Sequence, residues 1–556
     1  MASTTRTRTA ADLFVQCLEN EGVKYIFGVP GEENLDFLEA LAGDTNITFV
    51  TVRHEGGAAF MADVYGRLST YPGVCLATLG PGATNLLTGV ADAQLDRAPL
   101  VAITGQAGLD RIYKESHQYI DVVEMMRPIT KWNARVERAE SLPEITRKAF
   151  RLARLEKPGA THIELPEDVA GMHVPDDLAP MPVRRTTYPK ADPVSITRAT
   201  DILKDAARPV ILAGNGVIRR HAAESLRYFA RALGIGVTST FMAKGVLDYR
   251  DPLAQPAVGL RALEANQFGL TDADVVLCVG YDLVEWDPKL WNPHSDKTII
   301  HLDSTPAEID RHYLPSIEVV GEIADSLDAL RNALTGQQRR WATPHVANNE
   351  VEELHRFATD DSVPLKPQRV IAALRDALGD DDILISDVGA HKLWLSRLYP
   401  TAQPNTCIIA NGFAAMGIAL PGALAAKLVH PQRKVVAVNG DGGFLMNAQE
   451  LETARRMGTA FVTVVWKDGR YGVIELNQNR RFGRAFGIEF GNPDFVQFAR
   501  AFDVPAWRIE AADDLLPTLQ RALDLDVPSL IEVPVDYREN MHLAERLGGP
   551  LPDRVG

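Results

Sequence analysis

Short apolar runs alternate with helical stretches along the whole chain. The runs are rich in valine, isoleucine and leucine, which is typical of strands buried on both faces. Between them apolar residues recur at helical spacing, as in residues 10–20, where Thr9 and Asp12 resemble a capping box and Gly22 follows the last turn. This alternation predicts an α/β protein with parallel sheets. The predicted strands are residues 25–27, 48–50, 74–77, 100–103, 209–213, 275–279, 298–302, 383–385, 434–439, 460–466 and 529–533.

The chain has 556 residues, too many for one hydrophobic core, and this length predicts about three domains. Residues 172–193 are rich in proline and charge and are interpreted as a linker, and residues 335–367 as a second linker or a surface helix. The chain after Asp536 is predicted to be loop. The resulting division is three domains at residues 1–175, 192–335 and 365–540, followed by a tail at residues 541–556.

Composition excludes several classes of protein. A net charge of −15 disfavours a nucleic-acid partner, and no apolar run approaches the length of a membrane span. The first eight residues are polar and basic and lack the apolar core of a signal peptide. The four cysteines lie far apart and form no metal-binding pattern, which predicts buried, reduced thiols and a cytoplasmic protein.

The most informative motif is Gly440-Asp441-Gly442-Gly443, which follows a predicted strand and precedes a helical stretch at residues 445–457. Its glycines let the backbone approach a ligand, and the start of a helix suits a phosphate. Asp441 can supply a hard oxygen ligand for Mg²⁺, and Asp468 stands at the end of the next predicted strand. Asp468 also lies in a turn-like sequence, Lys467-Asp468-Gly469, and a turn and a metal ligand are compatible roles.

With these motifs in order, the chain resembles thiamine diphosphate (ThDP)-dependent 2-oxoacid enzymes over nearly its full length. Within that family it looks most like the acetolactate synthases, especially the catabolic, flavin-independent kind. The strings that carry the resemblance are Phe27–Gly31, Arg53-His54-Glu55, Ala58–Ala62, Leu79–Asn85, His117-Gln118, Tyr281–Asn292, Met416–Pro421 and Gly440–Phe444.

The resemblance implies an α/β fold of three doubly wound parallel-sheet domains: a pyrimidine-binding domain, a central domain and a diphosphate-binding domain. It also implies that Glu55 activates ThDP by bonding the aminopyrimidine ring. The alternative is a solvated glutamate at a helix start, where the dipole favours a negative charge.

The resemblance further implies a cofactor site. Asp441, Asp468 and the backbone carbonyl of Arg470 would bind Mg²⁺. Met416 matches the bulky side chain that bends the cofactor into a V shape, although a methionine at this place would otherwise be ordinary core. The cofactor-binding residues are predicted to be Gly389, Ala390, His391, Gly412, Met416, Gly440, Asp441, Gly442, Gly443, Asp468 and Arg470.

Three further residues match the substrate side of the synthases. Gln118 would hold a carboxylate or a developing oxyanion. His117 is as well explained as a surface or structural histidine. Lys131 aligns with a lysine near the synthase active site, and a solvated lysine at a strand start is the stronger alternative.

The central domain holds FAD in flavin-binding relatives. Here Gly214-Asn215-Gly216 follows a strand, but no third glycine or acidic partner completes a dinucleotide pattern. The string Gly280–Glu285 resembles the catabolic enzymes and favours a structural domain without FAD.

The chain departs from many relatives near the expected substrate funnel. Gly56 stands where a glutamine is common, Phe413-Ala414-Ala415 replaces a polar stretch, and Glu32-Glu33-Asn34 fills a loop that is usually less acidic. The second substrate is therefore the least constrained part of the prediction.

We therefore predict a Mg²⁺- and ThDP-dependent acetolactate synthase, with Glu55, Gln118 and Met416 as its catalytic residues. It would decarboxylate pyruvate and join the product to a second 2-oxoacid. The alternatives are a 2-oxoacid decarboxylase or oxidase, a carboligase with another acceptor, and a non-catalytic paralogue. The resemblance implies a homodimer at least and a homotetramer as the full assembly; the sequence leaves a regulatory subunit open.

Overall fold

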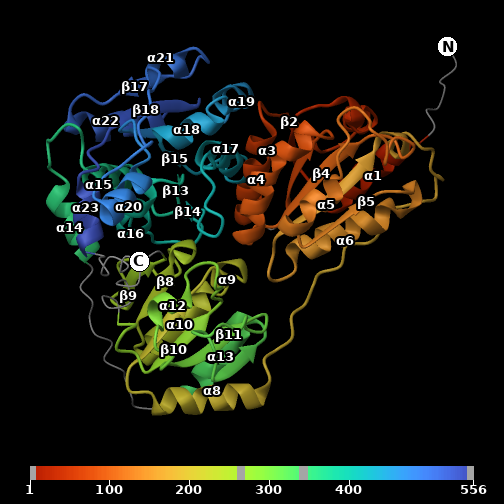
Figure 1. Cartoon of the computed structure of the whole chain (residues 1–556). Helices are drawn as coiled ribbons and strands as arrows, with labels where there is room; N and C mark the ends of the chain where they lie inside the picture. Colours follow the sequence, from red (N-terminus) through yellow and green to blue (C-terminus); the bar gives the residue numbers. More distant parts are fainter. Residues whose placement is uncertain (1–7, 70, 260–268, 337–348, 547–556) are drawn as a thin grey trace. The chain divides into compact units, whose positions relative to one another are not determined.

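The computed structural model describes residues 8–69, 71–259, 269–336 and 349–546 (Figure 1). It contains three six-stranded sheets, and the ladders between the named strands are parallel. The predicted α/β fold with three parallel sheets is confirmed. By its internal contacts the chain divides into two compact units. Unit 1 comprises the residues up to Thr186 with Phe413–Pro431 and Leu445–Thr459, and unit 2 comprises Thr187–Gly412, Gln432–Phe444 and the residues from Ala460.

Unit 1 is built on the first sheet, whose strand order is β2-β1-β3-β4-β6-β5. Apolar side chains on one face of the sheet pack with α1, α2 and α6, while α3 and α4 pack against each other and against strands of the sheet. A later helix, α17, packs on α3. The strands are β1 (Tyr25–Gly28), β2 (Thr48–Thr51), β3 (Gly73–Ala77), β4 (Leu100–Gln106), β5 (Trp132–Arg135) and β6 (Ala160–Pro166); the helices are α1 (Ala10–Asn20), α2 (Leu35–Leu41), α3 (Glu55–Leu68), α4 (Pro81–Leu95), α5 (Val122–Met126), α6 (Leu142–Arg154), α7 (Glu167–Ala170), α17 (Ala419–Val429) and α19 (Glu450–Met457).

Unit 2 contains the second sheet, with strand order β12-β11-β10-β7-β8-β9. Its core lies between the sheet and the helices α8, α10 and α13, drawn in yellow-green to green in Figure 1. The strands are β7 (Pro209–Ala213), β8 (Val237–Thr240), β9 (Ala254–Val258), β10 (Val275–Val279), β11 (Thr298–Asp303) and β12 (Ile317–Val320); the helices are α8 (Pro193–Asp205), α9 (Gly216–Arg219), α10 (Ala223–Leu233), α12 (Pro288–Trp291) and α13 (Ile323–Leu334).

The third sheet also belongs to unit 2 and has the order β14-β13-β15-β16-β18-β17. From β13 the chain adds β14 on one side of the sheet and then β15 on the other, so the strand order reverses between β13 and β15. Open α/β sheets bind ligands at such a point. The strands are β13 (Ile383–Ser386), β14 (Cys407–Ile409), β15 (Val435–Gly440), β16 (Val462–Lys467), β17 (Ala506–Arg508) and β18 (Ser529–Pro534); the helices are α14 (Asn349–Phe357), α15 (Pro367–Ala377), α16 (Ala390–Leu398), α18 (Asp441–Asn447), α20 (Gly472–Phe482), α21 (Phe495–Arg500), α22 (Leu515–Leu523) and α23 (Glu539–Arg546).

The local structure corrects two predictions. The chain after Asp536 is not all loop, because α23 covers Glu539–Arg546, and residues 547–556 lie outside the described residues. The helical stretch predicted at residues 445–457 is two helices, of which the first, α18, already begins at Asp441. The predicted helix start at Thr9 is confirmed, since Thr9 and Asp12 bond each other reciprocally as a capping box.

Other predictions stand. Residues 172–192 form no helix or strand apart from one bridge at His173, and α14 lies in the second linker region, of which residues 337–348 are outside the described part. All four cysteines are buried and free. Among the described residues no helix is long and apolar enough to cross a membrane. The domain boundaries stay a prediction.

An ionic cluster fixes α3 to α4 inside unit 1. The guanidinium of Arg67 contacts carboxylate oxygens of Asp63 at 2.5 Å, Asp92 at 3.3 Å and Asp96 at 2.7 Å, and all three aspartates are fully buried. Burial raises the pKa of Asp63 and Asp92, whereas the three carboxylates raise that of Arg67. One guanidinium group thus forms ion pairs with three buried carboxylates.

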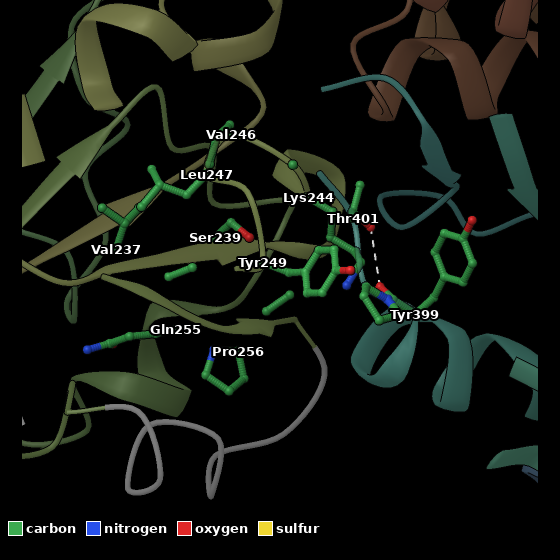
Figure 2. Close-up of a pocket in the computed structure, with 14 residues that line it drawn as sticks. Val237, Ser239, Lys244, Val246, Leu247, Tyr249, Gln255, Pro256, Tyr399 and Thr401 are labelled. Carbon is green, nitrogen blue, oxygen red and sulfur yellow. Dashed lines mark hydrogen bonds between the residues drawn. The ribbon is translucent and has the colours of Figure 1, made fainter. Parts of the chain in front are cut away.

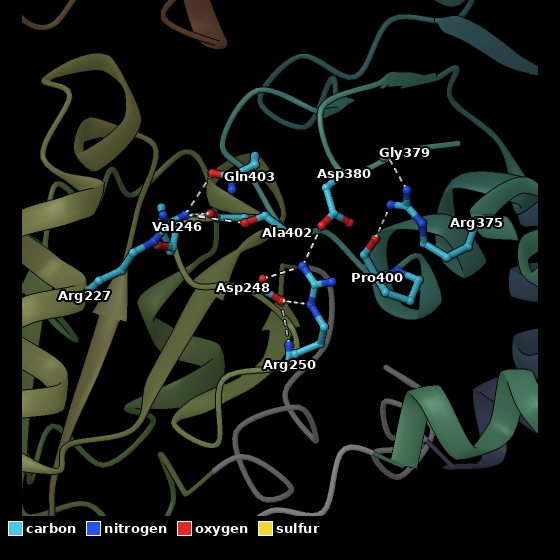
Figure 3. A network of polar contacts seen from close by, with 11 residues as sticks. Arg227, Val246, Asp248, Arg250, Arg375, Gly379, Asp380, Pro400, Ala402 and Gln403 are labelled. Atoms are coloured by element: carbon cyan, nitrogen blue, oxygen red, sulfur yellow. Dashed lines mark hydrogen bonds and ion pairs between the residues drawn. The ribbon is translucent and has the colours of Figure 1, made fainter. Parts of the chain in front are cut away.

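Arginines join the second and third sheets within unit 2 (Figure 3). Arg250 reaches Asp248 and Asp380, both at 2.6 Å. Arg227 donates to the carbonyl of Gly245 at 2.9 Å and to that of Ala402 at 3.4 Å. Arg227 on α10 and Arg250 after β8 thus reach the segments before β14 and β13, respectively, so charged hydrogen bonds as well as packing hold the two sheets of unit 2.

The Arg67 cluster gives a first prediction. Replacing Arg67 with Met leaves three buried carboxyl groups without their cation, and we expect unit 1 to lose about 3–5 kcal/mol of its free energy of unfolding. Chemical denaturation followed by circular dichroism measures this loss. Arg138→Ala removes an exposed arginine (79% exposed) and is the matched control, for which we expect no resolvable change. Equal stability of the two variants would contradict the assigned role of the cluster.

Candidate functional site

The predicted metal and diphosphate residues gather at one edge of the third sheet. β13, β15 and β16 are neighbours and parallel, so their carboxyl ends lie side by side. Gly389 follows β13, Asp441 follows β15 and Asp468 follows β16, while Gly412 comes after β14 at the same edge. The structure therefore brings together the residues that the sequence predicts for this part of the site.

Asp441 organises the loop that carries Asp468. Asp441 is 2% exposed, and its Oδ2 accepts hydrogen bonds from the backbone N–H groups of Asp468 (3.1 Å) and Gly469 (2.7 Å). Its Oδ1 accepts from the N–H of Gly442 at 2.9 Å. A buried carboxylate with this many donors is fixed in place and directs the next turn towards itself.

The carboxyl group of Asp468 lies near that of Asp441, and few groups offset the repulsion between their negative charges. Burial, and then the negative charge of Asp441, raise the pKa of Asp468 to about 7. Two carboxyl groups that repel each other at a sheet edge suit a divalent cation, because the cation removes the repulsion. Among the described residues no cluster of three His, Cys, Asp or Glu side chains could hold a metal, so the other ligands would be neutral oxygens or phosphate.

Asn492 is a residue of this site that the sequence analysis missed. Its Nδ2 donates to Asp441 Oδ2 at 2.8 Å, while its Oδ1 is buried without a partner among the described residues. The signal in the sequence, Gly491-Asn492-Pro493, indicates only a turn. A buried amide oxygen beside two carboxylates strengthens the fit to an oxygen-preferring cation such as Mg²⁺.

The turn at Arg470 is held at both sides. Phe490 N–H donates to the carbonyl of Gly469 at 3.1 Å, and Tyr471 N–H donates to the carbonyl of Ile488 at 2.9 Å. The Arg470 side chain pairs with Glu475 and Glu489. These contacts fix the backbone from which the Arg470 carbonyl is predicted to bind the metal.

The glycines of the predicted diphosphate cradle lie close to neighbouring side chains. A Cβ on Gly443 would lie 2.7 Å from Asp387 Oδ2, and a Cβ on Gly442 would lie 3.0 Å from the Tyr471 ring. Ala390 begins α16, the helix that follows β13. A bulkier residue at Gly442 or Gly443 would therefore disturb the edge where the diphosphate is predicted to bind.

His391 has a packing role beneath the cradle. It is 1% exposed, its ring packs edge-on against Trp466, and burial lowers its pKa to about 3. A Cβ on Gly389 would meet the His391 ring at 2.8 Å, and one on Gly440 at 3.1 Å. A neutral, enclosed imidazole supports the strand ends, and its predicted contact with the cofactor stays a prediction.

Glu55 lies in unit 1 at the start of α3. It is half-buried, and Asn85 Nδ2 donates to its Oε2 at 2.9 Å. A Cβ on Gly82 would lie 3.2 Å from Glu55 Oε1, so the carboxyl group rests against the first turn of α4. This placement is not that of a freely solvated glutamate. Asn85 ends the Leu79–Asn85 string that resembles the family, and the sequence alone does not mark it as a partner of Glu55.

Gln118 comes to the same end of unit 1. Its backbone has a left-handed conformation (φ +57°), its side chain is exposed, and its carbonyl would lie 2.4 Å from a Cβ on Gly80, which precedes α4. His117 is exposed, and its carbonyl accepts from Arg111. Gln118 is thus near the α4 start that Glu55 contacts.

Lys131 does not join these residues. Its Nζ donates to the carbonyls of Leu155 (2.6 Å) and Lys157 (2.7 Å), and it precedes β5 at the amino edge of the sheet. Glu55 follows β2 at the opposite, carboxyl edge. The structure therefore does not bring Lys131 together with Glu55 and Gln118, and a role in the active site stays a prediction.

Met416 sits on a tight turn and not in a packed core. Ala414 and Gly417 have positive φ values of 57° and 94°, and Met416 is half-exposed. The Ala415 N–H donates to Asp92 Oδ1 at 3.0 Å, and Asn447 Nδ2 donates to the Gly417 carbonyl at 2.8 Å. A side chain presented by a fixed turn suits the predicted wedge better than core filling.

A cavity in unit 2 is separate from these residues. It opens at the junction of the second and third sheets and is lined by residues that include Lys244, Tyr249 and Thr401 (Figure 2). The lining contains none of the predicted site residues. The candidate site is therefore built from strand ends and turns, not from this cavity.

Comparison with known proteins supports the predicted family. The N-terminal TPP binding domain of thiamine pyrophosphate enzymes matches residues 8–125, their central domain residues 196–330, and their C-terminal TPP binding domain residues 387–533. The acetolactate synthase of Bacillus subtilis (strain 168) is 36% identical over 560 residues, covering 98% of this chain and 96% of the relative. The chain belongs to the acetolactate synthase family of thiamine pyrophosphate enzymes.

Other relatives agree. The catabolic acetolactate synthase of Raoultella terrigena is 35% identical and covers 97% of both chains. The acetolactate synthase isozyme 1 large subunit of Escherichia coli (strain K12) is 31% identical, covering 100% of this chain and 99% of the relative. The predicted family, its three-domain α/β fold and its enzyme class are confirmed.

Asp441 gives the second prediction. Asp441→Asn removes a carboxylate that faces Asp468 and orders its loop, so we expect Mg²⁺-dependent binding of ThDP to weaken by about 100-fold. Isothermal titration with ThDP in the presence of Mg²⁺ measures this change. Asp513→Asn alters an aspartate that is 89% exposed and should bind ThDP like the wild type. Unchanged affinity in Asp441→Asn would place the metal elsewhere.

Proposed function

We propose that the protein is an acetolactate synthase that requires ThDP and Mg²⁺. It decarboxylates one pyruvate and joins the remaining two carbons to a second pyruvate, which yields 2-acetolactate and CO₂. The observation that carries the proposal is the pair Asp441 and Asp468 at the carboxyl ends of β15 and β16, in a chain whose relatives are named acetolactate synthases.

In this proposal the third sheet holds the cofactor. Asp441, Asp468 and the Arg470 carbonyl bind Mg²⁺, and Asn492 holds Asp441 and offers its free amide oxygen. Glycines 440, 442 and 443 with Gly389, Ala390 and Gly412 approach the diphosphate, while His391 supports the strand ends from below. When bound, ThDP supplies the carbon nucleophile and accepts the electrons released with CO₂.

The residues of unit 1 are proposed to position the cofactor and substrate and to exchange a proton with the cofactor. Glu55, oriented by Asn85, would exchange a proton with the aminopyrimidine ring of bound ThDP. Met416 would contact the cofactor from its fixed turn, and Gln118 would bind the carboxylate or the developing negative charge of a substrate. Family architecture implies that Glu55 of one subunit meets the cradle of another.

We infer a homodimer as the minimum active form and a homotetramer as the full assembly. Phe413 (46% exposed), Leu445 (38%) and Met446 (47%) are large apolar side chains of unit 1 that are partly exposed in a single chain. A partner subunit or a bound cofactor would bury them. A separate regulatory subunit is not part of the proposal, although three relatives are named large subunits.

The second sheet is proposed to be structural and free of FAD. Glu285 is 1% exposed, and its carboxyl group accepts the Asn215 N–H at 3.0 and 3.1 Å and the Thr240 hydroxyl at 2.5 Å. Asn215 lies in the glycine turn after β7, where a dinucleotide diphosphate would need the same N–H group. The carboxyl group of Glu285 already occupies that N–H group.

We also propose a cytoplasmic location. The four free, buried cysteines support it, because secreted proteins usually pair their cysteines.

Product analysis tests the proposal directly. Incubation of the purified protein with pyruvate, ThDP and Mg²⁺ should yield acetolactate and CO₂. Acetaldehyde as the main product would indicate a decarboxylase, acetate would indicate an oxidase, and no turnover would indicate a non-catalytic paralogue. Turnover of pyruvate only with another 2-oxoacid present would indicate a different acceptor.

Glu55 provides the third prediction. Glu55→Gln keeps the size of the side chain but not its exchangeable acid, so acetolactate formation should fall by at least about 100-fold. The fold and the Mg²⁺-ThDP affinity should stay those of the wild type. Glu140→Gln changes a glutamate that is 58% exposed and serves as the control. Full activity in Glu55→Gln would refute the assignment.

Glu285 provides the fourth prediction. Burial raises its pKa from 4.5 to about 7 in the folded protein, so the unfolded chain ionises first as pH rises. The stability that Glu285 contributes is complete below pH 4.5 and is lost as pH rises through about 7. Glu285→Gln should therefore flatten the decline in the free energy of unfolding over this window, measured by denaturation at several pH values. Glu224→Gln, an exposed change, should leave the slope unaltered.

A further inference from the structure

Glu450 is a buried acid that the mechanism above does not use. It is the first residue of α19 and is 0% exposed. Its Oε1 accepts hydrogen bonds from the backbone N–H groups of Arg53 (3.0 Å) and His54 (3.1 Å), and its Oε2 accepts the Thr453 hydroxyl at 2.6 Å. Arg53 and His54 directly precede Glu55, so this carboxyl group binds the backbone from which Glu55 projects.

The surrounding residues leave room for this contact. Gly57 lies in the first turn of α3, and a Cβ there would come within 2.8 Å of Glu450 Oε1. A side chain at position 57 would therefore displace the Glu450 carboxyl group from its place beside the two N–H groups. A second hydrogen bond, from Arg456 of α19 to the carbonyl of Thr51, joins the same two segments.

A carboxyl group is a costly way to fill space. Its burial must be offset by hydrogen bonds, and an apolar side chain of similar volume would fill the place at lower cost. The carboxyl oxygens of Glu450 accept hydrogen bonds from the two N–H groups just before α3 and from the Thr453 hydroxyl. The start of a helix has N–H groups that need acceptors, and the acceptor here comes from almost four hundred residues away.

We propose that Glu450 is a positioning residue for Glu55. By holding Arg53 and His54, it fixes the place and direction in which Glu55 leaves the chain, while Asn85 holds the carboxyl end of the Glu55 side chain. The inference rests on the proposed function, because it assigns Glu450 to the activation step of that reaction. Glu450 itself touches neither substrate nor cofactor in this proposal.

The test compares four full-length variants with the wild type: Glu450→Gln, Gly57→Ala, Glu452→Gln and Glu55→Gln. The first replaces one acceptor oxygen of Glu450 by an amide nitrogen that cannot accept, and the second displaces the intact carboxyl group by a methyl group. Glu452→Gln changes the glutamate two residues away, which pairs with Arg456 on the outside of α19, and is the matched control. Glu55→Gln marks the result of losing the activating acid itself.

Two readouts separate positioning from mere stability. In the cofactor-free protein, hydrogen exchange of the backbone amides of Arg53 and His54 should speed up by about tenfold in Glu450→Gln and Gly57→Ala, with the thermal midpoint little changed. In the loaded protein, kcat should fall by about 10- to 100-fold, while KM for pyruvate and the affinity for Mg²⁺-ThDP stay within about threefold of the wild type. Glu452→Gln should match the wild type in both.

The outcomes are distinct. An active wild type in which Glu450→Gln and Gly57→Ala behave like Glu452→Gln would overturn this inference alone. A lower thermal midpoint with unchanged kcat would also overturn it, because Glu450 would then be a structural residue only. A wild type that forms no acetolactate would overturn the proposed function, whatever the exchange rates are.

Discussion

The contact between Arg67 and its three aspartates is the interaction on which unit 1 depends. Asp63 and Arg67 lie on α3, and Asp92 and Asp96 lie on or beside the end of α4. Asp92 also accepts the N–H of Ala415, so the same cluster reaches the turn of Met416. Buried charges tolerate little displacement, because each one loses its partner if a helix shifts.

This cluster explains how two distant chain segments become one site surface. Glu55 is the first residue of α3, and Gly82 and Asn85, which lie near it, belong to the first turns of α4. The turn that carries Met416 is bound to Asp92 through the N–H of Ala415. None of the cluster residues needs to meet a ligand. They set the distance between the elements that carry the ligand-facing groups, and Glu450 then sets the start of α3 from the other side.

Much of the fold follows from local sequence. Buried strands such as β15 are continuous apolar runs, and glycine with aspartate at their ends marks the cradle. The strands that the pattern missed include β5, β14 and β17, which lie at sheet edges and are only three or four residues long, too short for a periodic signal. The tail helix α23 was missed because two prolines further along suggested loop.

The site divides in the same way. Asp441 and Asp468 follow strands and could be predicted, whereas Asn492 and Glu450 act through partners 51 and almost four hundred residues away, respectively. No local pattern marks such residues, because their role depends on which turn or helix the fold places opposite them. Lys131 shows the converse: a matching alignment carried no information about which edge of the sheet the side chain would reach.

The space at Gly57 links two positions that are remote in the gene. A methyl group at position 57 and a full-length acid at position 450 cannot both be accommodated without a shift, since they would stand 2.8 Å apart. The effect of a substitution at position 57 therefore depends on the length of the side chain at position 450, and the residues tolerated at the two positions are coupled.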